Sequence, residues 1–278
     1  MAIEIYFKKQ AIKIDNALLG YLPKPGTHAR KLHEAMLYAV MSGGKRVRPV
    51  LTLAACEAVG GDVRRVLPAA CALELIHCYS LIHDDLPCMD DDALRRGKPT
   101  CHVKFGEDTA VLAGDALLTL AFRILSEPVK NTPKDFSNRQ LETIRFIAEA
   151  VGSAGMVGGQ AVDIEYQDKK TNLAIMEYIN IHKSGALIAA SARVGVYLGG
   201  GNADQVRSIF RYGQALGLLF QIVDDILDEE GYAELLGLTQ AREEAAGIHR
   251  RAKNELKLLG KKGVILSEIA DFVLERKK

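Results

Sequence analysis

Two clusters of aspartate constrain the fold of this chain most strongly, because each follows a long apolar stretch. The first cluster, DDLPCMDDD, covers residues 84–92, and the second, DDILD, covers residues 224–228. Carboxylates this close together repel one another by about 4 kcal/mol per close pair at an effective dielectric constant of about 20. The residues before each cluster lack the polar stripe of an exposed helix. The clusters therefore predict two buried helices whose ends meet a bound cation.

The remaining sequence shows helical patterns and almost no strand signal. Residues 67–85 and 109–125 are rich in alanine and leucine and predict buried helices. Breaks between other helices are expected at Pro23 and Pro25, at Gly43 and Gly44, and at Gly60 and Gly61. We therefore predict an all-α fold, a large helical bundle in which a ligand binds between facing helices. The two aspartate clusters are expected to face each other across this bundle.

The composition limits the partners. No linker rich in proline, glycine or serine divides the 278 residues, so residues 1–278 are expected to form one domain. The formal charge of +1 gives no electrostatic reason to expect nucleic acid or an anionic membrane as the main partner. The N-terminus lacks a signal-peptide pattern, and no apolar run is expected to reach the roughly 20 residues of a membrane span. We therefore expect a soluble, cytoplasmic protein without a stable membrane anchor.

The cysteines indicate neither zinc nor a disulfide framework. The five cysteines are odd in number and contain no CxxC pair. We expect them to be reduced thiols that mainly pack in the core, which is the usual role of a free cysteine.

The aspartates have the ligand chemistry of a magnesium site. Hard oxygen ligands without matching His or Cys favour Mg²⁺, which usually binds one or two carboxylates together with substrate phosphates. Asp224 and Asp228 are four residues apart, so they lie on one helix face about 6 Å apart along the axis. Asp84 and Asp90 would point to opposite sides of a regular helix, but Pro87 interrupts it and lets them converge. The alternative for an acidic run is a solvated helix face, which the apolar context disfavours.

Basic residues accompany these acids. They are Arg95 and Arg96 after the first cluster, Lys45, Arg46 and Arg48 within GGKRVRP, and Lys183 within HKSGAL. Cations next to a magnesium site suit a ligand with several phosphate oxygens. For Arg46, a surface charge or salt bridge is an equal alternative. GGKRVRP does not have the P-loop pattern, so nucleotide hydrolysis is disfavoured.

Five motifs follow one another in an order that points to a family. They are GGKRVRP, a DDxxxxD motif followed by LRRGKPTCH, GQAVDI, KSG and FQIVDDILD. In these motifs, from about residue 31 to the final ERKK, the chain resembles the short-chain trans-isoprenyl diphosphate synthases, most closely the bacterial farnesyl diphosphate synthases. The resemblance implies an isoprenoid-synthase bundle around a deep central cavity, usually in a homodimer. It also implies head-to-tail condensation of isopentenyl diphosphate with dimethylallyl or geranyl diphosphate to give farnesyl diphosphate.

The resemblance assigns roles to individual residues. Magnesium, with three ions per active site, would be bound by Asp84, Asp90 and Asp224, with Asp228 in support, and Asp85 would be either an additional ligand or a residue that contacts a ligand. The allylic diphosphate would be bound by Arg95 and Lys183, and isopentenyl diphosphate by Lys45, Arg48, His77 and Arg96. Dipoles at Gln160, Lys183, Ser184 and Gln221 would stabilise an allylic carbocation, so Lys183, Gln221, Asp84 and Asp224 are the expected catalytic residues. A lone histidine such as His77 is otherwise more often a satisfied core residue.

Product length is expected to depend on Tyr79. It lies five residues before Asp84, about 7.5 Å along the helix, where an aromatic residue in the family forms the floor of the tail pocket and favours farnesyl diphosphate. The alternative is ordinary core packing. Other possibilities are a geranylgeranyl diphosphate synthase and a non-catalytic regulatory subunit, although such subunits usually lose one aspartate motif. A terpene cyclase is disfavoured because cyclases pair one aspartate motif with an Asn/Ser/Glu metal triad, and no such triad stands near Asp224.

One segment departs from the family pattern. After the second motif the family continues through a polar loop of about twenty residues, which contains a lysine for the allylic diphosphate. This chain passes from Glu230 directly to GYAELLGL. The sequence leaves open a natural deletion or a mobile active-site loop missing from the sequence as read, and the latter is the preferred explanation. An intact mass of 30.3 kDa would establish the deletion.

Overall fold

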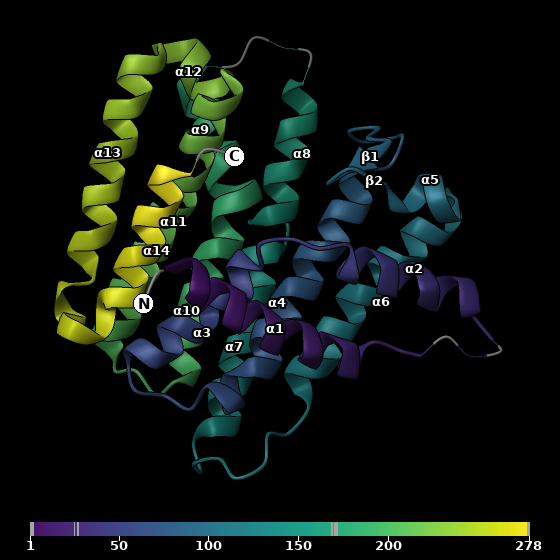
Figure 1. The fold of residues 1–278 in the computed structure, drawn as a ribbon, viewed down its shortest axis with the longest axis horizontal. Coiled ribbons are helices and arrows are strands. Elements are labelled where there is room, and N and C mark those ends of the chain that lie inside the picture. The colour runs from purple at the N-terminus through teal and green to yellow at the C-terminus, as the bar shows by residue number, and fades with distance from the viewer. Residues whose placement is uncertain (1–2, 25, 27, 168, 170–171, 277–278) are drawn as a thin grey trace. The chain divides into compact units, whose positions relative to one another are not determined.

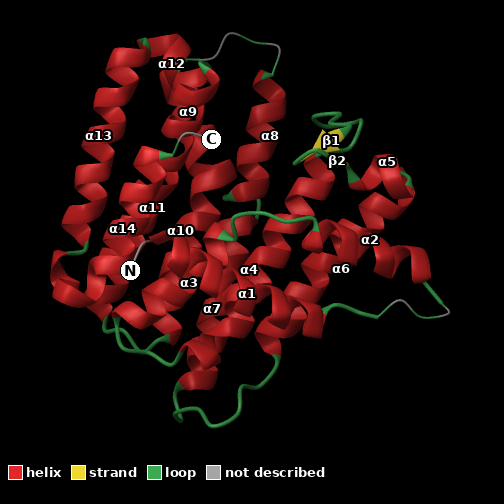
Figure 2. Cartoon of the chain, viewed as in Figure 1, coloured by secondary structure: helices red, strands yellow, loops and turns green. Residues whose placement is uncertain are grey.

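The structure is a computed structural model that describes residues 3–24, 26, 28–167, 169 and 172–276. Pro25 and the last two lysines of ERKK, which the sequence analysis used, lie outside these residues. The described residues are mostly helical (Figures 1 and 2), with one antiparallel hairpin of strands β1 (Leu94–Arg95) and β2 (Lys98–Pro99). The prediction of an all-α fold is therefore confirmed.

The chain forms two compact units. The first unit contains residues 4–50 and 67–130, and the second contains residues 51–66 and 131–276 with Ile3. Each unit is described by itself, and the single domain of residues 1–278 stays a prediction. The helices through the first aspartate cluster and beyond it are α1 (Ile3–Tyr21), α2 (Arg30–Met41), α3 (Val47–Ala58), α4 (Val63–Asp84), α5 (Cys101–Phe105) and α6 (Glu107–Ser126).

The remaining helices lie in the second unit, which also contains residues 51–58 of α3 and residues 63–66 of α4. They are α7 (Phe136–Val151), α8 (Met156–Tyr166), α9 (Leu173–Ile179), the π-helix η1 (Asn180–Gly185), α10 (Ala186–Leu198), α11 (Ala203–Asp228), α12 (Gly231–Leu236), α13 (Leu238–Glu255), the 3₁₀ segment η2 (Lys257–Gly263) and α14 (Val264–Glu275). The breaks predicted at Pro23, Gly43, Gly44, Gly60 and Gly61 all lie between helices.

Helices α4 and α6 supply much of the core of the first unit. The residues of α4 from Ala69 to Ile76 are all buried. By length and composition alone, α4 and α6 are apolar enough to cross a membrane, and 67% and 50% of their most apolar windows are buried within the protein. The expectation that no apolar stretch reaches that length is therefore wrong, because a helix in the core of a globular protein is apolar on most of its sides.

The long helix α11 organises the second unit, where it contacts α10, α13 and α14 (Figure 1). Its start is fixed by a capping box in which Asn202 and Gln205 exchange hydrogen bonds. A Cβ atom on Gly217 would stand 2.7 Å from the Cα of Gly185, so only glycine permits this close approach of α11 to η1. The fully buried Tyr212 donates its hydroxyl hydrogen to the Leu266 carbonyl of α14 at 2.7 Å. The DDILD motif thus ends a firmly anchored helix.

Candidate active site

The first aspartate cluster folds into a turn directly after α4. The helix ends at Asp84, and the chain turns through Pro87. The amide of Asp90 donates to the Asp84 carbonyl at 2.9 Å, and the amide of Asp91 donates to the Leu86 carbonyl at 3.2 Å. The turn therefore brings the backbones of Asp84 and Asp90 together after Pro87, and the convergence of their carboxylates stays a prediction.

Asp85 has a different environment from its neighbours in the cluster. Its side chain is 5% exposed, and its Oδ1 lies 2.6 Å from Nε and 2.5 Å from Nη2 of Arg95. Burial raises the pKa of the Asp85 carboxyl more than the Arg95 guanidinium lowers it. Nη2 of Arg95 also contacts Asp92 at 3.1 Å. Asp85 therefore holds Arg95 beside the cluster, and its role toward magnesium stays a prediction.

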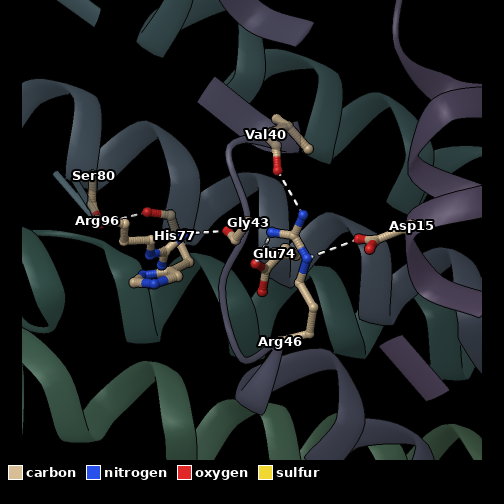
Figure 3. Close-up of polar contacts among 8 residues, drawn as sticks. All are labelled: Asp15, Val40, Gly43, Arg46, Glu74, His77, Ser80 and Arg96. Carbon is tan, nitrogen blue, oxygen red and sulfur yellow. Dashed lines mark hydrogen bonds and ion pairs between the residues drawn. The ribbon is translucent and has the colours of Figure 1, made fainter. Parts of the chain in front are cut away.

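Three of the four residues expected to bind isopentenyl diphosphate interact in the first unit. Burial, followed by the charges of Arg48 and Arg96, holds the pKa of His77 well below its ordinary value of 6.5. The guanidinium of Arg96 donates to the Gly43 carbonyl (Figure 3). A Cβ on Gly44 would stand 2.7 Å from Nη1 of Arg96, so the glycine makes room for the arginine. The fourth residue, Lys45, is exposed on the same turn.

Arg46 points away from this cluster, into the interior. It is 3% exposed and uses all three of its guanidinium nitrogens. Nε donates to Asp15 at 2.9 Å, Nη1 to Glu74 at 2.7 Å, and Nη2 to the Val40 carbonyl at 2.6 Å (Figure 3). Of the two alternatives weighed for Arg46, the structure shows an ion pair, and a buried one.

The second aspartate cluster ends α11. Asp224 and Asp228 share this helix, and Asp228 is exposed. Oδ1 of Asp224 forms an ion pair with Nη2 of Arg276 at 2.6 Å, and Arg276, 6% exposed, also donates to the Phe220 carbonyl at 2.5 Å. The sequence analysis missed Arg276 as a partner of this motif. Its only signal was its place in the ERKK segment.

Asp225 closes the short connection after α11. Its Oδ2 accepts a hydrogen bond from the Tyr232 amide in the first turn of α12 at 3.0 Å. A Cβ on Gly231, whose φ is 51°, would stand 2.4 Å from the same oxygen. Burial raises the pKa of the Asp225 carboxyl. The direct passage from Glu230 to GYAELLGL is thus a tight turn that a hydrogen bond to Asp225 stabilises. An intact-mass measurement would decide whether it arose by a natural deletion.

Lys183 lies in the π-helix η1, a geometry that is frequent at functional sites. Its Nζ contacts Oδ2 of Asp163 on α8 at 2.6 Å. A Cβ on Gly159, one turn before Asp163, would stand 2.2 Å from the Lys183 amide nitrogen. Asp163 belongs to the GQAVDI motif, but the sequence analysis gave it no role. The structure identifies it as the partner of Lys183.

The residues assigned to the carbocation lie in the same unit. Ser184 follows Lys183 in η1, and Gln221 is half-buried on α11. Both side-chain polar atoms of Gln160 are buried and lack a hydrogen-bond partner among the described residues. A buried, unsatisfied polar group costs about 1–3 kcal/mol. The unsatisfied amide of Gln160 on α8 therefore destabilises the fold and needs an explanation.

Among the described residues, a cavity lies in each unit. A small cavity of about 50 Å³ in the first unit touches Asp85, Arg95 and Arg96. A larger one, about 740 Å³, lies over α10 and α11 in the second unit, and its lining does not include Lys183, Gln221 or Asp224.

The carboxylates suit Mg²⁺ better than they suit a metal ion whose ligands all come from the protein. Within the part of the chain that the structure describes, no group of three or more His, Cys, Asp or Glu side chains could hold a metal ion. Pairs such as Asp84 with Asp90, all with oxygen donors, suit Mg²⁺, because this ion keeps several waters and completes its shell with substrate phosphates.

Comparison with known proteins identifies the family. The polyprenyl synthetase family profile matches residues 29–241. The chain belongs to the polyprenyl synthetase family. It is 42% identical to a chloroplastic geranylgeranyl pyrophosphate synthase of Capsicum annuum over 98% of this chain and 78% of that protein. A geranylgeranyl diphosphate synthase of Cyanophora paradoxa is 40% identical over 88% of this chain and 87% of its own.

Solved structures agree with this assignment. The crystal structure of an apo FPP/GFPP synthase from Zymomonas mobilis superimposes with a TM-score of 0.93 at 40% identity, covering 99% of this chain and 100% of that chain. The fold is therefore that of the isoprenoid synthases, and the protein is a prenyltransferase of the prenyl diphosphate synthase kind. The alignment with the Capsicum protein extends over 294 residues, more than the 278 of this chain, so that relative contains residues without a counterpart here.

Proposed function

We propose that this protein condenses isopentenyl diphosphate head to tail with allylic diphosphates and that its main product is geranylgeranyl diphosphate. The observation that carries the reaction is the pair of aspartate clusters, each accompanied by a cation, within a polyprenyl synthetase chain. The names of relatives between 40% and 42% identical support the twenty-carbon product.

The allylic diphosphate is bound through magnesium. Asp84 and Asp90 in the first cluster, and Asp224 and Asp228 in the second, would hold the ions. When bound, Mg²⁺ stabilises negative charge on the departing diphosphate. Arg95, which Asp85 orients, and Lys183, which Asp163 orients, would add cationic contacts to the same group. The two orienting carboxylates keep these long side chains from sampling other rotamers before the substrate arrives.

Isopentenyl diphosphate is bound without a metal by Lys45, Arg48, His77 and Arg96. The depressed pKa of His77 keeps its imidazole neutral at pH 7. A neutral imidazole donates one N–H to a phosphate oxygen, while the three cations supply the charge. The arginines also suit planar, bidentate recognition of phosphate.

The bond-forming step needs no protein nucleophile. Departure of the allylic diphosphate leaves a carbocation, which the dipoles of Gln160, Ser184 and Gln221 would stabilise. The double bond of isopentenyl diphosphate supplies the electron pair for the new carbon–carbon bond. Loss of a proton to the released diphosphate then forms the double bond of the product. The unsatisfied amide of Gln160 is consistent with a side chain that meets its partner only in the complex.

Farnesyl diphosphate is the second candidate product, and Tyr79 favours it. This side chain is 7% exposed on α4 and packs edge-on against His83, with ring centroids 5.8 Å apart. An aromatic ring fixed at this depth would stop a growing chain after fifteen carbons. Core packing remains the alternative for Tyr79.

Product analysis distinguishes these candidates. Purified protein is incubated with Mg²⁺, dimethylallyl diphosphate and labelled isopentenyl diphosphate, and the dephosphorylated products are sized by chromatography. A twenty-carbon product supports the proposal, whereas a fifteen-carbon product that lengthens in Tyr79→Ala would replace it with farnesyl diphosphate and a Tyr79 floor. Absence of turnover by a folded sample would favour the regulatory-subunit alternative. Homodimer formation and a cytoplasmic location stay predictions.

A further inference from the structure

The turn that carries Lys45 leads directly into α3, where Arg48 lies, and it is held by an ion network with no substrate contact of its own. The turn lies between α2 and α3, and Arg46, its last residue, has a positive φ of 51°. This left-handed conformation is unfavourable for a residue with a Cβ atom. Something must therefore stabilise Arg46 in this conformation.

Three bonds from Arg46 supply that stabilisation. They tie the turn to Asp15 on α1, to Glu74 on α4 and to the Val40 carbonyl on α2. The side chains of Arg46 and Glu74 are 2% and 3% exposed, so this pair is hardly screened by water. Figure 3 shows the guanidinium surrounded by these three partners.

The same network fixes the turn relative to His77. Glu74 lies three residues before His77 on α4, about one turn along the helix. The ion pair thus links the backbone of the turn to the helix segment that presents His77. Arg96 is attached to the other side of this turn, at the Gly43 carbonyl. All four residues proposed for isopentenyl diphosphate are therefore positioned with respect to one turn.

We infer that Arg46 and Glu74 are positioning residues for isopentenyl diphosphate, although neither touches it. The inference rests on the proposed function of Lys45, Arg48, His77 and Arg96. Arg46 cannot contribute as a direct phosphate ligand while all its nitrogens face the interior. Its effect should reach the isopentenyl site and leave the allylic site unchanged.

A double variant separates positioning from stability. Arg46→Met alone removes the hydrogen-bonded ion-pair partner of the buried Glu74 carboxylate, on which the charge of Arg48 still acts, and should lower the urea unfolding midpoint. Arg46→Met with Glu74→Met replaces both charges by apolar side chains of similar length, and the midpoint should recover. We expect the KM and dissociation constant for isopentenyl diphosphate to stay raised by roughly 10- to 100-fold in this double variant. The KM for geranyl diphosphate should be unchanged.

Arg30→Met is the matched control. Arg30 forms an ion pair with Glu34 on α2, but its side chain is 72% exposed, so its loss should change none of these constants. If the double variant does not fold, Arg46→Lys serves instead. Lysine keeps the charge but cannot make the three-way fork, and it too should raise the isopentenyl KM selectively.

Two results would overturn the inference. One is a stable double variant that binds isopentenyl diphosphate like the wild type, which would make the network purely stabilising. The other is an equal rise of both KM values. Calorimetric titration with isopentenyl diphosphate keeps this test separate from the proposed function. Wild-type protein that binds isopentenyl diphosphate more tightly than Arg46→Lys, yet never turns over, would support positioning and refute the synthase reaction.

Discussion

Replacing Gly159 by alanine should destabilise the protein and displace Lys183. The new Cβ would stand 2.2 Å from the Lys183 amide nitrogen and 2.8 Å from the Lys183 Cα. Both atoms belong to backbone, so a rotamer change cannot relieve the clash. Overpacking costs about 1–3 kcal/mol, and alanine regains up to about 1 kcal/mol of helix propensity in α8. We expect a net loss of up to about 2 kcal/mol, together with a longer contact between Lys183 and Asp163.

Urea unfolding and steady-state kinetics measure these two effects. Gly247→Ala is the matched control, because Gly247 lies within α13 of the same unit and its nearest neighbour to a new Cβ is an arginine nitrogen at 3.9 Å. That variant should gain stability from propensity alone. For Gly159→Ala we expect a higher KM for the allylic diphosphate. Equal or greater stability than wild type with an unchanged allylic KM would refute the close-approach argument.

Three further predictions concern single groups. The folded-state pKa of His77 lies below the ordinary 6.5, so the unfolded state binds more protons. Urea unfolding should therefore show that the free energy of unfolding falls as the pH drops below about 6.5. His77→Asn should weaken this pH dependence, and an unchanged pH dependence would contradict the role given to His77. Asp225→Ala should lose about 0.5–2 kcal/mol of unfolding free energy as the α12 cap disappears, while the Mg²⁺ concentration for half-maximal turnover stays the same; a large shift would make Asp225 a metal ligand. A thiol reagent should label Cys88, the exposed cysteine, in the native protein, and mass spectrometry showing rapid labelling of Cys71, whose pKa burial raises to about 12, would contradict this.

The features that depend on local spacing were predictable from the sequence. The alanine-rich stretches gave α4 and α6, and the four-residue spacing placed Asp224 and Asp228 on α11. Pro87 correctly indicated the turn that joins Asp84 and Asp90. In each case, helix geometry or a proline acts within one or two turns of the residues concerned.

The partners of long charged side chains were not predictable. Arg46 reaches Glu74 and Asp15, which are 28 and 31 residues away in sequence. Arg276, directly after α14, reaches Asp224 on α11. A flexible arginine can meet any carboxylate that tertiary packing brings within its reach, so spacing alone cannot select the partner. The hydrogen bond that Asp225 accepts from the start of α12 was also not predicted, because it depends on where α12 packs.

Product length was only partly predictable from the sequence. The position of Tyr79 on α4 follows from spacing, and its burial is observed. The names of the relatives favour a longer product than this residue suggests.

Calorimetric binding of each substrate with and without Mg²⁺ tests the central claim most directly. The account assigns the allylic diphosphate to the aspartate clusters through metal and isopentenyl diphosphate to Lys45, Arg48, His77 and Arg96 without it. Geranyl diphosphate should therefore bind at least about tenfold more tightly with Mg²⁺ than with EDTA, and Asp84→Asn or Asp224→Asn should remove this difference. Isopentenyl diphosphate should bind equally in both conditions. Metal-independent binding of geranyl diphosphate would contradict the proposed roles of both aspartate clusters.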